Sequence, residues 1–197
     1  MVKGATLQSQ NDIPQTSFYS ETIDYSLFHS GDLIFRRGNG ILSQTVLHRD
    51  RTSEFSHVGI IKIINNRPYV IHASPGKPLG TNAIVKLETI DDFLRDASVL
   101  AAVYRLNQNH VSLGNNASSL AHEYSVRKVP FDTQFSLKSL DKFYCTELVW
   151  QAYLQSGIDL VAQNFSTLSF PFNKEPYILP SDLLSSKHIY QVHQFEW

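Results

Sequence analysis

The single cysteine of the chain, Cys145, lies where a nucleophilic thiol could form. It falls in the first turn of a helix predicted over residues 144–156, whose apolar residues recur at helical spacing and which Gly157 ends. Backbone N–H groups in that turn are unpaired and carry about half a positive charge, which favours a thiolate. We therefore predict a nucleophilic Cys145 with a lowered pKa. The alternative is a core residue, because free cysteine is among the most buried residue types.

Two histidines are predicted to share one face of a β-hairpin. His57 opens a strand over residues 57–64, and His72 lies in the returning strand over residues 69–74. A two-residue turn at Asn65-Asn66 sets His72 opposite Gly59 and makes His57 its diagonal neighbour. Such neighbours lie roughly 7–8 Å apart, within reach of two imidazole rings. A base oriented by a polar group on the next strand is the logic of a catalytic triad, and Gly59 is expected to leave room for a helix terminus. The alternative is a pair of ordinary hydrogen-bonded histidines.

Other candidate chemistry has little support in the sequence. The remaining histidines show no ligand spacing such as H-E-x-x-H, so no metal site is predicted. There is no G-x-S-x-G elbow and no phosphate-binding loop ending in G-K-[ST], so neither a serine hydrolase nor a nucleotide cofactor is expected. Glu147 is two positions from Cys145 and faces away from it on a helix. Arg36 and Arg37 could bind a carboxylate, but adjacent strand residues point oppositely, so at most one faces the site.

The elements that must position these residues form a strand-rich centre with helices around it. A turn and strand over residues 30–36 precede the hairpin, and further strands are expected at residues 83–87, 99–105 and 189–192. Besides the helix at Cys145, helices are expected at residues 43–47, from Thr89 onward and at residues 116–127, with a turn at residues 181–184. This arrangement favours an α+β fold. Residues 1–20 are a polar lead-in, and residues 21–197 are predicted to form a single domain.

Composition excludes several classes of protein. The 197 residues are 42% hydrophobic and carry 17 Lys and Arg against 18 Asp and Glu, so the chain lacks the basic excess of a nucleic-acid binder. One cysteine excludes an intramolecular disulfide and any multi-cysteine metal site. No apolar run of about 18 residues exists, so no membrane span is predicted. The first residues lack the apolar core of a signal peptide, and a cytoplasmic protein is expected.

Four motifs resemble the NlpC-type papain-fold hydrolase superfamily. They are Gly31-Asp-Leu-Ile-Phe-Arg36, Ser56-His-Val-Gly-Ile60, Val70-Ile-His-Ala-Ser74 and Tyr144-Cys-Thr-Glu-Leu-Val149. Their order, with the cysteine last, resembles the circularly permuted branch of YiiX/YaeF/YebB-like proteins. The resemblance covers residues 30–184. It implies a circularly permuted papain-like (NlpC-type) fold, in which a central antiparallel sheet packs against helices.

The resemblance also implies roles for individual residues. Cys145 aligns with the nucleophile, His57 with the general base, and His72 with a third residue that is Glu in some permuted relatives. Phe131 occupies the position where a phenol is often found, so a hydroxyl contact to the substrate would come from Tyr144. The backbone N–H of Cys145 is the expected oxyanion donor. We expect the substrate to contact Tyr144, Arg36 and Asp132.

These inferences together predict a cofactor-free thiol hydrolase that cleaves amide bonds in small peptides. Family analogy suggests peptides derived from the cell wall. The loop at residues 37–54 and the apolar loop at residues 165–172 are expected to wall a short groove, which suits a small molecule or short peptide. One alternative is a lipid ester hydrolase or acyltransferase, whose acyl chain the second loop would suit. Another is a binding module that has lost turnover. The oligomeric state is not predicted.

Overall fold

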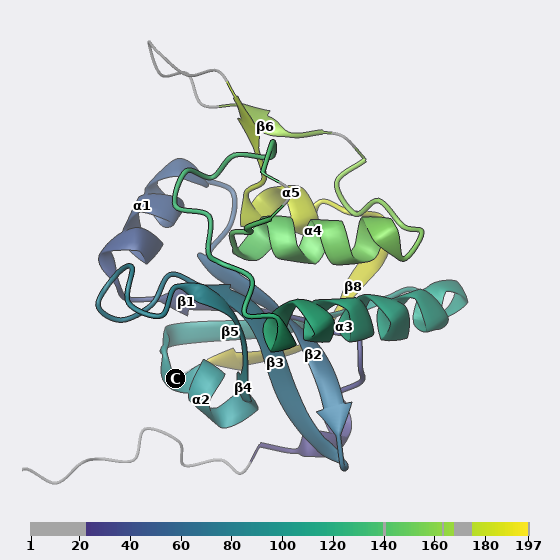
Figure 1. The fold of residues 1–197 in the computed structure, drawn as a ribbon. Helices are drawn as coiled ribbons and strands as arrows, with labels where there is room; N and C mark the ends of the chain where they lie inside the picture. Colours follow the sequence, from purple (N-terminus) through teal and green to yellow (C-terminus); the bar gives the residue numbers. More distant parts are fainter. Residues whose placement is uncertain (1–22, 140, 163, 168–174, 197) are drawn as a thin grey trace, which may run out of the picture.

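A six-stranded antiparallel sheet forms the centre of the computed structural model, which describes residues 23–139, 141–162, 164–167 and 175–196 (Figure 1). Its spatial order is β4-β3-β2-β1-β5-β8. The strands are β1 (Leu33–Gly38), β2 (His57–Ile64), β3 (Arg67–Ser74), β4 (Ile84–Thr89), β5 (Ala97–Leu106) and β8 (Ile189–Glu196). The first four follow one another along the chain as neighbours, so the hairpin with both histidines lies within a local meander.

Helices cover both faces of the sheet (Figure 1). Helices α3 (Val111–Val126) and α4 (Cys145–Gln155) pack on one face, and α2 (Ile90–Arg95) packs on the other. The remaining elements are α1 (Ile41–Arg49), α5 (Pro180–Leu184), the strand pair β6 (Ser166–Thr167) and β7 (Pro176–Tyr177), and 3-10 turns at Tyr25–Leu27 and Gln108–His110. None of the helices in the described ranges is long and apolar enough to cross a membrane.

Alternation along the strands divides the core in two. In β1, Leu33 and Phe35 face the core beneath α3 and α4, whereas Ile34 faces the cluster beneath α2. The same period places Arg36 on the α2 side. His57 is the register partner of Arg36 and shares that side.

The hairpin has the predicted register. Asn65 and Asn66 have φ values of 50° and 60°, as a two-residue turn of the mirror-image type requires. Ile60 pairs with Ile71 and Ile64 with Arg67, which sets His72 opposite Gly59 as expected. Backbone pairing between β2 and β3 runs from Ile64 and Arg67 to Ile60 and Ile71. The two histidines lie just beyond this last pair.

Two boundaries differ from the sequence predictions for physical reasons. Helix α3 begins at Val111, well before the predicted residue 116. Its Gly114 is buried against Gly31, where an added Cβ would lie 2.3 Å from the Gly114 backbone, and this close packing offsets the low helix propensity of Gly-Asn-Asn. Strand β4 extends to Thr89 instead of ending at residue 87, because it pairs with β3 through Tyr69. The predicted lead-in at residues 1–20 lies outside the described residues.

Candidate active site

The rings of His57 and His72 are joined by a direct hydrogen bond. His57 Nε2 lies 2.7 Å from His72 Nδ1, and both side chains are buried. The rings meet edge to face, and the ring of Phe93 from α2 packs against both. The predicted placement of the two histidines on one face is therefore confirmed.

Glu88 extends this pair by one more residue. Its Oε1 lies 2.9 Å from His72 Nε2, and its Oε2 lies 2.5 Å from Lys86 Nζ. His72 pairs with Lys86 across β3 and β4, so Glu88 is the diagonal neighbour of His72 on the same face. Sequence reasoning missed Glu88 because the predicted strand ended at residue 87. The parity argument used for the histidines would have found it.

Burial and hydrogen bonding fix where the protons lie in this chain of groups. Burial alone would raise the pKa of Glu88, but the contacts with His72 and Lys86 outweigh it and hold the pKa at about 2. Burial lowers the pKa of His72 to about 4, so this ring is neutral near pH 7. Burial and the nearby Arg36 charge hold the pKa of His57 well below its ordinary value.

One arrangement of protons satisfies these bonds. A carboxylate only accepts, so His72 donates its Nε2–H to Glu88 and keeps an unprotonated Nδ1. His57 then donates its Nε2–H to that nitrogen. This leaves Nδ1 of His57 unprotonated and free to act as a base.

Gly59 allows His72 to approach His57. A Cβ at this position would lie 2.5 Å from Val70 Cγ1, 2.9 Å from the Ile71 carbonyl oxygen and 3.2 Å from His72 Cβ. The expectation that Gly59 leaves room for a helix terminus is wrong. The space is filled by the neighbouring strand β3 instead.

Cys145 is the first residue of α4 and is partly exposed. Burial by the surrounding protein raises the pKa of its thiol to about 11, although backbone hydrogen bonds from Val58, Thr146 and Cys145 itself act in the opposite direction. The predicted lowering of this pKa is therefore wrong, because desolvation outweighs the charge at the helix terminus. Near neutral pH the site holds a neutral thiol and a neutral imidazole rather than an ion pair.

The start of α4 is held by its own residues. Glu147 is fully buried, and its Oε2 accepts a hydrogen bond of 3.4 Å from the backbone N–H of Tyr144. Burial raises the pKa of Glu147 to about 8. As predicted, Glu147 shares no hydrogen bond with the thiol among the contacts of the described residues.

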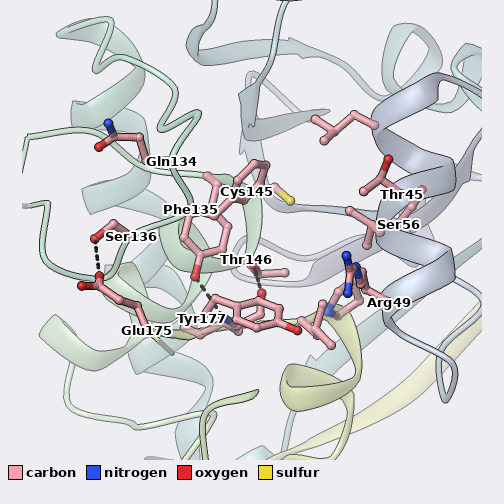
Figure 2. Close-up of a pocket in the computed structure, with 16 residues that line it drawn as sticks. Thr45, Arg49, Ser56, Gln134, Phe135, Ser136, Cys145, Thr146, Glu175 and Tyr177 are labelled. Carbon is pink, nitrogen blue, oxygen red and sulfur yellow. Dashed lines mark hydrogen bonds between the residues drawn. The ribbon is translucent and has the colours of Figure 1, made fainter. Parts of the chain in front are cut away.

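Two cavities meet at Cys145. The larger has a volume of about 680 Å³, and its lining includes Cys145, His57 and Arg36. The smaller has a volume of about 300 Å³ and lies between α1, the start of α4 and the segment before α5 (Figure 2). Figure 2 shows the Cys145 sulfur directed toward the side formed by Thr45 and Ser56. No hydrogen bond joins Cys145 to His57 in the described part of the chain, but both line the larger cavity.

Arg36 lies beside the histidines, whereas Arg37 faces elsewhere. The Arg36 guanidinium is 4.3 Å from the centroid of the Phe93 ring, donates to the Phe93 carbonyl, and lies 3.5 Å from Asp96. It is buried at the wall of the larger cavity. Arg37 instead lies 3.9 Å from Glu54.

The other two predicted substrate contacts hold the local fold. The Tyr144 hydroxyl accepts a 2.9 Å hydrogen bond from the Ile178 backbone, and Tyr144 also lines the smaller cavity. Asp132 is fully buried, accepts hydrogen bonds from Gln134 and Ser136, and lines neither cavity.

The predicted walls are only partly those observed. Helix α1 supplies Leu42 and Val46 to both cavities, in agreement with the expected wall at residues 37–54. Residues 177–180 line the opposite side of the smaller cavity. Phe165 packs against Trp150 of α4, and residues 168–172 lie outside the described residues.

Comparison with known proteins gives the family of the chain. A family model described as permuted papain-like amidase enzyme, YaeF/YiiX, C92 family, matches residues 27–193. The chain belongs to this family. The predicted resemblance to the permuted branch is thereby confirmed. No curated protein matches the chain.

A solved structure shows the same fold. The crystal structure of metalloprotein YiiX from Escherichia coli O157:H7 is similar with a TM-score of 0.69, covering 85% of this chain and 97% of that one. The two sequences are 22% identical. This similarity confirms the predicted α+β, permuted papain-like architecture.

The metalloprotein description of YiiX does not carry over to the residues seen here. Among the described residues, no three His, Cys, Asp or Glu side chains gather in a way that could hold a metal ion. Glu88, His72 and His57 form a series in which each group is hydrogen-bonded to the next. We therefore derive no step through a metal.

Proposed function

We propose that this chain is a thiol-dependent amide hydrolase with Cys145 as nucleophile and His57 as general base. The observation that carries the proposal is the hydrogen-bonded series Glu88, His72 and His57, which ends at a cavity that Cys145 also lines. A base that is oriented by a second group and faces a helix-terminal thiol is the arrangement that nucleophilic catalysis needs.

The first half of the reaction forms a thioester. Nδ1 of His57 removes the thiol proton as the sulfur attacks the carbonyl carbon, so no free thiolate is needed beforehand. The backbone N–H of Cys145, in the first turn of α4, is the proposed donor to the oxyanion. His57 then gives the proton to the leaving nitrogen as the C–N bond breaks.

The second half regenerates the enzyme. His57 removes a proton from water, the resulting oxygen attacks the thioester, and the sulfur leaves with the proton returned by His57. Throughout, the ionised Glu88 stabilises the positive charge on the imidazoles through His72.

Small amides, such as short peptides, suit the dimensions of the site. Cavities of about 300 and 680 Å³ on either side of the thiol are the size of ordinary ligand pockets. Peptides derived from the cell wall remain one proposed source. A lipid ester or acyl-transfer substrate is the second candidate, favoured by the largely apolar lining of the smaller cavity.

The test is a substrate panel with Cys145→Ala as control. We expect Cys145-dependent cleavage of tripeptides and tetrapeptides derived from the cell wall or of simple acyl amides, and none of casein or intact sacculi. Release from casein or sacculi without cleavage of small amides would contradict the proposal. Activity on acylated lipids alone would favour the second candidate.

A further inference from the structure

The positions of Cys145 and His57 set the direction in which a substrate must lie. Cys145 lines both cavities, whereas His57 lines only the larger one. The group that protonates the leaving nitrogen must be within hydrogen-bond reach of it. The leaving amine therefore lies in the larger cavity, and the acyl group lies in the smaller one.

The smaller cavity presents mainly apolar surface to an acyl group. Leu42, Val46, Phe135 and Tyr177 contribute to its walls. Among the hydroxyl groups of its lining, Thr146 donates its proton to the Ile178 carbonyl, while Tyr144 and Ser56 accept from the backbone N–H groups of Ile178 and Gly38. A cavity of about 150 Å³ is enough to hold benzene. The smaller cavity, with a volume of about 300 Å³, therefore suits an apolar acyl group roughly twice the size of benzene.

The larger cavity carries an excess of positive charge. Arg36, Lys77 and Lys86 line it. Arg36 and Lys77 both contact the single carboxylate of Asp96, at 3.5 and 2.5 Å, while Lys86 is paired with Glu88. Three cations thus share two carboxylates, and both histidines are neutral. The lining therefore keeps a net charge of about plus one, which favours an anionic group on the ligand.

We infer that the substrate is an N-acyl amino acid, with a medium-length apolar acyl group in the smaller cavity and a leaving amine that carries a free carboxylate in the larger one. The inference rests on the proposed thiol hydrolase function and names its substrate class. Arg36 and Lys77 bind the carboxylate in place of part of their contact with Asp96, because charge-assisted hydrogen bonds to a carboxylate are strong. A free N-acyl amino acid and an acylated dipeptide both combine an apolar acyl group with a free carboxylate, so either compound fits this description.

The carboxylate is tested with N-octanoylalanine and its primary amide, N-octanoylalaninamide. We expect kcat/KM for the acid to exceed that for the amide at least tenfold. In Lys77→Gln this ratio should fall toward one. Lys187→Gln removes an exposed lysine that lines neither cavity and should leave the ratio unchanged. N-octanoylalanine and N-octanoyl-glycylalanine, compared side by side, distinguish a free N-acyl amino acid from an acylated dipeptide.

The acyl group is tested with a series from acetylalanine to palmitoylalanine. We expect a maximum of kcat/KM at about eight to ten carbons, the length that fits roughly twice the volume of benzene. Thr45→Trp should fill the smaller cavity from the exposed side of α1 and move the maximum to shorter chains. Gln44→Trp places the same ring on an exposed neighbour that lines neither cavity, and should not move it.

The outcomes separate the substrate class from the hydrolase function. Cys145-dependent cleavage with no preference for acid over amide overturns the substrate class and leaves the hydrolase standing. If none of these compounds is cleaved while the short peptides of the earlier panel are, the substrate class is overturned and the hydrolase stands. If neither set is cleaved, the hydrolase function fails, and calorimetric binding to Cys145→Ala tests the ligand class by itself. Binding of N-octanoylalanine at least tenfold tighter than its amide then supports this ligand class, and equal binding overturns it.

Discussion

At the scale of single residues, Glu88 sets the direction of proton transfer in the proposed mechanism. The carboxylate can only accept, so each imidazole nitrogen between it and the cavity has an assigned role as donor or acceptor. A neutral His72 alone would not define this direction, because either tautomer could face His57. Glu88 therefore completes the general base as a positioning residue, although it lines neither cavity.

Replacing Glu88 should impair the base without removing it. In Glu88→Gln we expect kcat/KM on a cleaved amide to fall about 10- to 100-fold, the equivalent of roughly 1.4–2.7 kcal/mol in the transition state. The charge that stabilises the imidazoles is lost, while His57 and Cys145 remain. Glu123→Gln, at an exposed position on α3, is the matched control. An unchanged kcat/KM in Glu88→Gln would show that the series ends at His72.

The thiol should behave as a desolvated one. Because burial raises the pKa of Cys145 to about 11, alkylation of the folded protein by iodoacetamide should keep accelerating from pH 7 to pH 10. Cys145 is the only cysteine, so the reaction reports on this site alone. In denaturant the midpoint should return to about 8.5. A plateau already reached at pH 7 in the folded protein would contradict the neutral resting state.

At the scale of elements, the close approach of β2 and β3 at Gly59 brings the two histidines together. Backbone pairing between the two strands extends as far as Ile60 and Ile71. Two residues before Ile60, the backbone of Val58 forms a hydrogen bond with the Cys145 thiol. Gly59 lets His72 fill the same region from the other face.

Adding a methyl group at Gly59 should push these strands apart. We expect Gly59→Ala to lower the free energy of unfolding by about 1–3 kcal/mol, the usual cost of overpacking, and to weaken activity by displacing His72. Denaturant unfolding measures the first effect. Gly40→Ala is the control, since a Cβ there would meet nothing within 4 Å and its cost is limited to the helix N-cap. Equal losses in the two variants would contradict the packing argument.

The hairpin could be predicted because strand parity and the Asn65-Asn66 turn are local. Both depend on residues close in sequence, and the register followed directly. The early start of α3 could not be predicted from the sequence, because it depends on the contact between Gly114 and Gly31, which are far apart along the chain. The thiol pKa was mispredicted for a similar reason: the helix terminus is a local feature, whereas burial depends on the whole fold.

At the scale of the whole molecule, the order of four short motifs was enough to predict the fold, although each motif alone is weak. The roles of Tyr144 and Asp132 were expected from the same resemblance, yet their polar atoms are occupied by the backbone and neighbouring side chains. Motif order reports on topology, while a substrate contact depends on which side chains the surrounding loops leave free.

The buried histidines should make the molecule sensitive to acid. Unfolded His72 binds a proton below pH 6.5, but folded His72 does so only below about pH 4. Between these values the unfolded state takes up more protons, so stability falls as the pH falls. We expect a loss of about 2 kcal/mol from His72 between pH 7 and pH 5.

Urea unfolding at several pH values measures this loss. In His72→Gln the decline between pH 7 and pH 5 should be smaller by about that amount. A decline of the same size in both proteins would assign the acid sensitivity to other groups.

The order of the catalytic groups along the chain has a consequence for biosynthesis. Strands β1 to β4 and helix α2 lie within residues 33–95, so His57, His72 and Glu88 leave the ribosome well before α4 does. Cys145 is made about fifty residues later. Until α4 has been made, the emerging protein carries the residues of the proposed base without a thiol beside them. Its thiol meets that base only when α4 docks, so a nascent chain cannot acylate itself before the pocket around the sulfur has formed.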